Sequence, residues 1–205
     1  MPRLSRLLGE RRPTVATLGR NDSDDTRLVA GISDREPWAI AELFDRYSAV
    51  VRRMLFRTLG SETDLDDLAQ ETFLTVIRRC STLREPQALP GFVVGVAVRT
   101  AQNEMRRRSL RRFVGLEHVA VTGTEHDPEQ RQQVTRAYAL LQKLDATSRI
   151  VFVLRFVEEL GLPEIARALD ISLATAKRRL ARAERRFEAM AAADPVLRDY
   201  LREGS

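Results

Sequence analysis

The sequence has very few of the residues that build disulfide frameworks and zinc sites. Among its 205 residues are one cysteine, Cys80, and two histidines, His118 and His126. A single cysteine excludes an internal disulfide framework. Together with two histidines it is too small a set for a zinc site of the usual composition. We therefore expect no metal, no other cofactor and a reducing compartment.

Long apolar runs and a leader-like segment are also missing. The longest apolar stretch, residues 92–98 with a glycine inside it, is far shorter than the about 20 residues that span a bilayer. The start of the chain, residues 1–6, is basic, but the apolar core of a secretory signal does not follow it. We expect a cytoplasmic protein without membrane insertion.

Positive charge is in excess. The chain has 34 Lys and Arg against 29 Asp and Glu, a formal net charge of +5, and Lys143 and Lys177 are its only lysines. A basic balance indicates a polyanionic partner. A solvated surface often carries as much charge, however, so the positions of the arginines matter more than their total.

Apolar residues recur at helical spacing over most of the chain, without strand-like alternation, and this predicts an all-α fold. Ser33 and Glu36, followed by Pro37, have the pattern of a capping box at a helix start. We expect that helix to end at Gly60. The residues expected on its buried face are Trp38, Leu43, Phe44, Tyr47, Val50, Val51, Met54 and Leu55.

A second helix is predicted over residues 64–80, with acidic residues in its first turns as the helix dipole favours. Its apolar face contains Leu65, Leu68, Ala69, Phe73, Val76, Ile77 and Cys80. The opposite stripe contains Asp67, Gln70, Glu71, Leu74 and Arg78. A third helix, 92–108, changes from apolar to basic and ends in three arginines, Arg106, Arg107 and Arg108.

Residues 109–130 lack a helical stripe, contain Gly115, Gly123 and Pro128, and change from basic to acidic, as a linker between domains does. The sequence thus predicts two small helical domains joined by a flexible linker. The boundaries we expect are a flexible N-terminal extension at 1–24, domains at 25–108 and 131–193, and a short helical tail at 194–205.

Residues 164–187 have the layout of a helix-turn-helix. A short helix over 164–169 is followed by a turn with Asp170, and Ser172 is placed to cap the second helix. Ala176, Leu180, Ala183 and Phe187 follow one inward face of that helix. The residues left facing outward or beside that face are Thr175, Lys177, Arg178, Arg179, Arg182, Arg185 and Arg186. Such a helix can enter a DNA groove, where arginine binds phosphate or guanine through two hydrogen bonds.

Two segments, in this order, resemble the bacterial RNA polymerase sigma factors of the extracytoplasmic-function (ECF) group. The first is the acidic helix Asp66-Asp67-Leu68-Ala69-Gln70-Glu71-Thr72-Phe73. The second is Glu164-Ile165-Ala166 followed by Thr175-Ala176-Lys177-Arg178-Arg179-Leu180-Ala181-Arg182-Ala183. The resemblance covers roughly residues 25–190.

This resemblance implies a protein that binds core RNA polymerase and directs it to promoters, restrained by an anti-sigma protein. The acidic helix would bind the polymerase through Asp66, Asp67, Gln70, Glu71 and Leu74. The domain 25–108 would bind the minus-ten promoter element, with contacts from Arg99, Asn103, Arg106 and Arg107. The helix-turn-helix would bind the minus-thirty-five element through Thr175, Lys177, Arg178, Arg179 and Arg182.

The minus-ten segment departs from the family pattern. Phe92-Val93 stands where the family usually has Trp-Leu. In one alignment the family's Arg-Asn pair falls on Val98-Arg99 and its Asp on Asn103. A shift by one residue places Thr100 on the Asn and Glu104 on the Asp. The loop before this helix, residues 80–91, would receive a base flipped from the non-template strand and is poor in aromatic residues.

No catalytic set is present, because the acidic pair Asp66-Asp67 has no histidine or metal ligand near it in the sequence. The main alternative to a sigma factor is a helix-turn-helix repressor or activator that acts without polymerase. Against it, the N-terminal domain shows no ligand-pocket, phosphoacceptor or dimer pattern. A more distant alternative is an adaptor whose basic helices bind acidic proteins.

Overall fold

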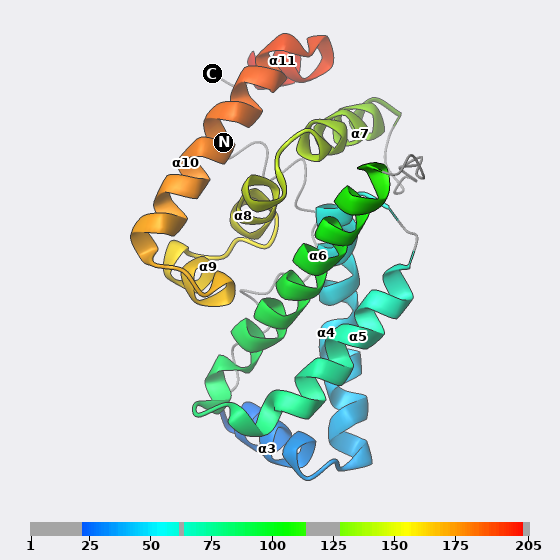
Figure 1. Ribbon diagram of the computed structural model, residues 1–205, viewed down its shortest axis with the longest axis vertical. Helices are drawn as coiled ribbons and strands as arrows, with labels where there is room; N and C mark the ends of the chain where they lie inside the picture. Colours follow the sequence, from blue (N-terminus) through cyan, green and yellow to red (C-terminus); the bar gives the residue numbers. More distant parts are fainter. Residues whose placement is uncertain (1–21, 62–63, 114–127, 203–205) are drawn as a thin grey trace.

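The computed structural model describes residues 22–61, 64–113 and 128–202, and every regular element in these ranges is a helix. The helices form two groups, the N-terminal module (22–113) and the C-terminal module (128–202), which lie against each other (Figure 1). The prediction of an all-α fold with two helical units is confirmed. No helix of the described residues is long and apolar enough to cross a membrane.

The N-terminal module is a bundle of three longer helices with a shorter one across one end (Figure 1). Its elements are α3 (Asp22–Ser33), α4 (Pro37–Leu59), α5 (Leu65–Arg79), the 3₁₀ turns η1 (Cys80–Thr82) and η2 (Pro86–Ala88), and α6 (Leu89–Phe113). Helix α5 packs against both α4 and α6. Helix α3 is tied to α4 by the buried Asp25, whose carboxylate accepts a 2.6 Å hydrogen bond from Arg46.

The end of α4 agrees with the sequence prediction and its start does not. Gly60 has a φ of 71°, a left-handed conformation that glycine adopts without strain, and its N–H donates to the Phe56 carbonyl at 2.6 Å. The predicted capping box is absent, because the Ser33 hydroxyl donates to the Val29 carbonyl one turn earlier at 2.8 Å. Ser33 is therefore the end of α3, and Glu36 precedes α4 without a side-chain cap.

The buried face of α4 follows the predicted positions except for two aromatic residues. Trp38 is 38% exposed and Phe44 is 37% exposed. Each ring has one covered face: the Arg27 guanidinium lies 4.5 Å from the Trp38 ring centre, and the Phe44 and Phe73 centroids are 4.2 Å apart. Both aromatic residues thus sit at the rim of the core.

The C-terminal module is built around the buried helix α8. Its elements are α7 (Pro128–Gln142), α8 (Ala146–Phe156), α9 (Leu162–Leu169), α10 (Leu173–Ala193) and α11 (Pro195–Arg202). The Phe152 ring contacts those of Phe156 and Phe187, with centroids 4.6 and 4.7 Å apart, and so joins α8 to α10. Helix α11 buries Leu197 completely, and the short helical tail predicted at the end of the chain is confirmed.

The ends of the predicted linker are helical. Helix α6 continues through Phe113 because no glycine or proline interrupts residues 109–113, and α7 begins at Pro128, a residue suited to a first helical turn. The middle of that linker, 114–127, and most of the predicted N-terminal extension, 1–21, lie outside the described residues. The buried residues of the two modules form one continuous apolar cluster.

Candidate nucleic-acid interface

Helices α9 and α10 form the predicted helix-turn-helix. The Gly161 N–H donates to the Glu164 carboxylate at 2.6 Å and so closes the first turn of α9. Asp170 ends α9 with a φ of 52°, in the left-handed conformation that aspartate tolerates better than most residues. The Ile171 N–H then donates to the Ala166 carbonyl at 3.0 Å. These bonds fix the turn between the two helices.

Ser172 caps α10, as the sequence predicts. Its hydroxyl oxygen accepts a hydrogen bond from the Thr175 N–H at 3.2 Å, and the hydroxyls of Ser172 and Thr175 are 2.9 Å apart. The cap therefore occupies the hydroxyl of Thr175, the first residue predicted to contact DNA. It also fixes the direction in which the start of α10 leaves the turn.

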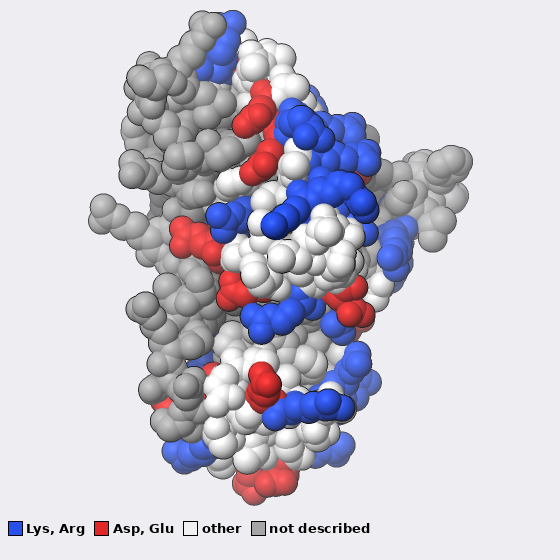
Figure 2. Space-filling view, turned by 90° about the vertical axis from the view of Figure 1, so that its left-hand side faces the viewer, with Lys and Arg blue, Asp and Glu red and all other residues white. Residues whose placement is uncertain are grey.

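The two sides of α10 differ in burial as the spacing predicts. The predicted inward residues are all buried: Ala176, Leu180, Ala183 and Phe187. On the other side Lys177, Arg178 and Arg182 are exposed, whereas Arg179 is half-buried. Figure 2 faces the side of the molecule on which α10 lies and shows Lys and Arg side chains gathered there. Helix α10 thus presents a basic face that a polyanion can approach.

The positive charge of α10 acts on its own module at Asp145, the residue that caps α8. Partial burial opposes ionisation of the Asp145 carboxyl, but hydrogen bonds from the Ser148 N–H and hydroxyl, together with the charges of Arg182 and Arg186, lower its pKa below the ordinary value. Arg182 therefore lies close enough to α8 to interact with the Asp145 carboxylate.

Helix α6 carries the second basic group. Arg99, Asn103, Arg106 and Arg107 are exposed, and Arg107 lies 3.5 Å from the Glu104 carboxylate. Arg108 is buried and donates to that carboxylate at 2.9 Å. Of the two alignments, the one on Arg99 and Asn103 falls on the exposed side of α6. The one on Thr100 and Glu104 falls on buried residues.

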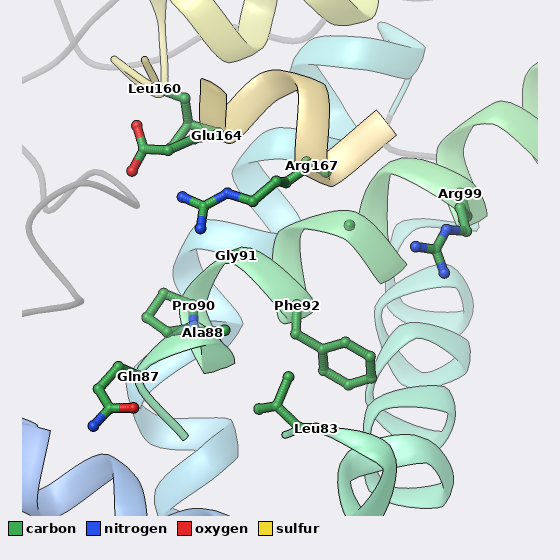
Figure 3. Close-up of a pocket in the computed structure, with 12 residues that line it drawn as sticks. Leu83, Gln87, Ala88, Pro90, Gly91, Phe92, Arg99, Leu160, Glu164 and Arg167 are labelled. Atoms are coloured by element: carbon green, nitrogen blue, oxygen red, sulfur yellow. The ribbon is translucent and has the colours of Figure 1, made fainter. Parts of the chain in front are cut away.

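The loop before α6 borders a pocket of about 360 Å³ between the modules (Figure 3). Leu83, Phe92 and Arg99 line it from the N-terminal module, and Glu164 and Arg167 line it from α9. The half-buried Phe92 ring packs against the apolar cluster, and Leu83 lies below it in the view of Figure 3. Sequence reasoning missed the contribution of Arg167, because nothing in its spacing ties α9 to α6.

The acidic stripe of α5 is exposed along its length. Asp66, which pairs with Arg52 of α4, is exposed, as are the four residues that follow it on this face: Asp67, Gln70, Glu71 and Leu74. Leu74 is 49% exposed, an unusual position for a large apolar side chain one turn after Glu71. We define Asp66, Asp67, Gln70, Glu71 and Leu74 as the acidic face of α5. Within the described residues, no cluster of three or more Cys, His, Asp or Glu could hold a metal ion.

Comparison with known families gives two matches in the order of the two modules. Residues 43–111 match the family model of Sigma-70 region 2, and residues 135–187 match that of Sigma-70 region 4. The first match covers α5 and most of α4 and α6, and the second covers the helix-turn-helix.

Individual relatives agree with these matches. The chain is 31% identical over 149 residues to the ferric citrate uptake sigma factor FecI of Escherichia coli, covering 69% of this chain and 84% of FecI. It is 27% identical over 188 residues to the RNA polymerase sigma factor CnrH of Cupriavidus metallidurans, covering 85% of this chain and 98% of CnrH.

Solved structures show the same fold. CnrH in complex with the cytosolic domain of CnrY superposes with a TM-score of 0.63 at 24% identity, covering 83% of this chain and 98% of CnrH. The sigma factor RpoE of Bartonella quintana, in complex with the anti-sigma factor NepR, superposes with a TM-score of 0.62 at 16% identity, covering 75% and 97%. The chain therefore belongs to the sigma-70 family of RNA polymerase sigma factors, in its extracytoplasmic-function group.

Proposed function

We propose that this sigma factor binds core RNA polymerase through the acidic face of α5, and that α10 and the basic end of α6 recognise the two promoter elements. The observation that carries the proposal is the pairing of a capped basic helix in a helix-turn-helix with a separate exposed acidic face on the other module. A repressor that acts alone needs the first of these surfaces and has no use for the second.

The acidic face suits a basic protein helix as its partner. Its carboxylates offer charge, Gln70 offers an amide, and the half-exposed Leu74 offers apolar contact beside them. Opposite charge guides association and fixes orientation, while the apolar contact adds affinity when water is removed. This combination supports protein docking better than a solvated acidic surface does.

The basic faces suit two separate DNA contacts. The exposed Arg178 and Arg182 lie about one helical turn apart, on a side of α10 that can turn toward base edges. The exposed arginines of α6, Arg99, Arg106 and Arg107, are placed for phosphates, with Asn103 between them. We assign α10 to the minus-thirty-five element and α6 to the minus-ten element.

The test is co-purification with core polymerase followed by run-off transcription. The double variant Asp67→Arg with Glu71→Arg should lose polymerase binding and transcription while its helical content stays unchanged. A matched control, Asp34→Arg with Asp45→Arg, makes the same charge change at exposed positions outside the acidic face and should keep both. Unchanged affinity in the first variant would place the docking surface elsewhere.

The same proposal includes an inhibitory protein partner, cytoplasmic action, and action by binding alone, without a catalytic step of its own. Support for an inhibitor comes from the similar structures, in which CnrH is bound to CnrY and RpoE to NepR. Protein isolated from its native cells should carry a polypeptide that competes with core polymerase. Recovery of the protein bound to polymerase alone, under conditions where it is inactive, would contradict this part.

A further inference from the structure

A buried carboxylate joins the two modules. Glu158 follows α8 in the C-terminal module and is fully buried. Its Oε2 atom accepts a 3.4 Å hydrogen bond from Arg53, and its Oε1 atom lies 3.7 Å from the guanidinium of Arg57. Both arginines belong to α4. A buried charge is stable only with partners, and here the partners come from the opposite module.

The end of α4 makes a second connection to the C-terminal module. Arg149 of α8 donates to the Thr58 carbonyl at 3.0 Å, across 91 residues of sequence. Close by, Gly60 lies so near the Gln142 side chain that a Cβ atom there would be 2.1 Å from its amide nitrogen. The last turn of α4 therefore fits closely against α7 and α8.

The third connection lies between α6 and α9. A Cβ atom on Gly95 would be 3.3 Å from the Ala168 carbonyl oxygen, so the missing side chain lets α9 approach the α6 backbone. Val98 lies three residues later, on the same side of α6, and is 2% exposed. In one alignment Val98 stands where the family has an arginine. An apolar residue suits a side of α6 that another helix covers.

In this arrangement the two DNA-binding helices lie too close together to span both promoter elements. The minus-ten and minus-thirty-five elements are separated by about 25 base pairs, or ~85 Å at 3.4 Å per base pair. Arg99 of α6 and Arg167 of α9 line the same pocket (Figure 3). Helix α9, with eight residues, is only about 12 Å long, and α10 begins directly after its turn. The two DNA-binding helices cannot reach both elements while the modules are joined.

We infer that the free protein rests in a closed form, latched by Glu158 between Arg53 and Arg57, and that the modules must separate before polymerase and promoter are engaged together. This inference rests on the proposed function, since it concerns how the same surfaces become available. The latch is releasable because its contacts, 3.4 and 3.7 Å, are long, and all three charged groups regain water when the modules part.

The conformation can be measured in the full-length free protein with a pair of spectroscopic labels at Thr82→Cys and Ala174→Cys, which are exposed positions on different modules. The native Cys80 stays unlabelled because it is fully buried and burial raises the pKa of its thiol. We expect a short and narrow distribution of label distances in the otherwise unchanged protein. A broad, long distribution there would overturn the closed form.

Two variants open the molecule by different routes. Glu158→Gln removes the charge of the latch at constant size. Gly95→Gln places a side chain between α6 and α9 while favouring the helical backbone of α6. The matched control is Gly91→Gln in the same helix, because a Cβ atom at Gly91 would meet nothing within 4 Å. The first two should lengthen the label distance and the control should not. Distances unchanged in both would overturn the latch.

A third variant keeps the test decisive if Glu158→Gln fails to fold. Arg53→Gln weakens the latch from the N-terminal module, where the arginine is half-buried on an otherwise intact α4. Circular dichroism should show the same helical content in all variants. If Glu158→Gln loses helix, the decision falls to Arg53→Gln and Gly95→Gln, whose unchanged distances would equally overturn the latch.

Affinity for core polymerase tests the consequence of opening. If about one free molecule in ten is open, opening variants bind up to about tenfold more tightly, because apparent affinity scales with the competent fraction. Gly91→Gln should bind like the parent protein. Variants that open without a gain in affinity would overturn the inference. If the parent protein and every variant fail to bind polymerase, the proposed function fails, and the label distances alone decide the closed form.

Discussion

Helices α6 and α10 both carry several arginines, but they differ in how much of their circumference is buried. In α10 the buried residues follow a single stripe, and exposed basic residues begin in the second turn, at Lys177. In α6 every residue from Val93 to Val98 is buried, and exposed basic residues begin only at Arg99. Helix α10 has a single packed side, whereas α6 is covered all round over residues 93–98.

This difference shows that a helical segment with apolar residues on all sides packs against a second partner as well as the first. Helix α6 packs against α4 and α5 on one side and against α9 on the other. A helix that is apolar all round is a buried helix, and burial of α6 on both sides requires the C-terminal module. Helix α10 needs only its own module, so its basic face is accessible in the closed form.

The largest effect is expected where α10 depends on its own core. Phe187→Ala should lower the free energy of unfolding by about 3–5 kcal/mol, because it removes a fully buried ring stacked on Phe152 and leaves a cavity. Denaturant unfolding of both proteins measures the difference. Glu188→Ala, at the exposed neighbouring position, should change stability by less than about 0.5 kcal/mol. Equal effects would mean that α10 is not anchored through this ring.

A smaller loss of stability is expected on the buried side of α6 and none on its exposed side. Glu104→Gln should cost about 2 kcal/mol of stability, because it weakens a buried hydrogen bond between charged groups, Glu104 and Arg108. Asn103→Ala, one residue earlier and exposed, should leave stability unchanged and weaken binding to minus-ten DNA. Urea unfolding and transcription from a minus-ten mutant series measure the two effects. A DNA defect in Glu104→Gln at full stability would favour the alignment on Thr100 and Glu104.

Within α10, the next contrast is between base contact and phosphate contact. Arg178→Ala or Arg182→Ala should lose roughly 1–3 kcal/mol on the true upstream element and less on scrambled DNA. Lys177→Ala, turned away from that stripe, should weaken binding to both DNAs alike and reduce the salt dependence by about one phosphate contact. A binding series on both DNAs at several salt concentrations distinguishes the two roles. Equal losses throughout would leave specificity to DNA shape.

The smallest effect concerns the cap of α8, which α10 reinforces. Asp145→Ala should cost about 1 kcal/mol at neutral pH, since the carboxylate accepts from the Ser148 N–H and lies near Arg182. Because folding lowers the pKa of Asp145, its contribution is present above the unfolded pKa of about 3.9 and is lost as the pH falls through the folded value. The free energies of unfolding of the parent protein and Asp145→Ala should therefore differ more at pH 7 than at pH 3. A constant difference would show that the charge of Asp145 is irrelevant.

Local features of both modules could be predicted from the sequence. The Ser172 cap, the left-handed Asp170 and the end of α4 at Gly60 each depend on residues within one or two turns. The inward face of α10 could be predicted equally well, because a helix with a single packed side shows a clear period of apolar residues. The capping box at Ser33 was wrong because the pattern does not tell whether a hydroxyl closes the preceding helix or opens the next.

The junction between the modules could not be predicted. Arg53 and Glu158 are 105 residues apart, and charged residues are assigned to the surface unless a partner is known. The one local signal was the apolar run before Arg99, which has no polar side. The contacts assigned to polymerase and DNA, on the acidic face of α5, on α6 and on α10, stay predictions until the variants above are measured.

Because of Arg149, separation of the two modules affects the N-terminal module more than the C-terminal one. Its guanidinium donates to the carbonyls of Gln142, the last residue of α7, and of Leu144, just beyond that end. It also donates to the carbonyl of Thr58, in the last turn of α4. One cation thus neutralises the negative ends of two helix dipoles that belong to different modules. When the modules part, the arginine stays with α7, and only α4 loses its counter-charge. The N-terminal module alone then has a helix end whose carbonyls must be satisfied by water.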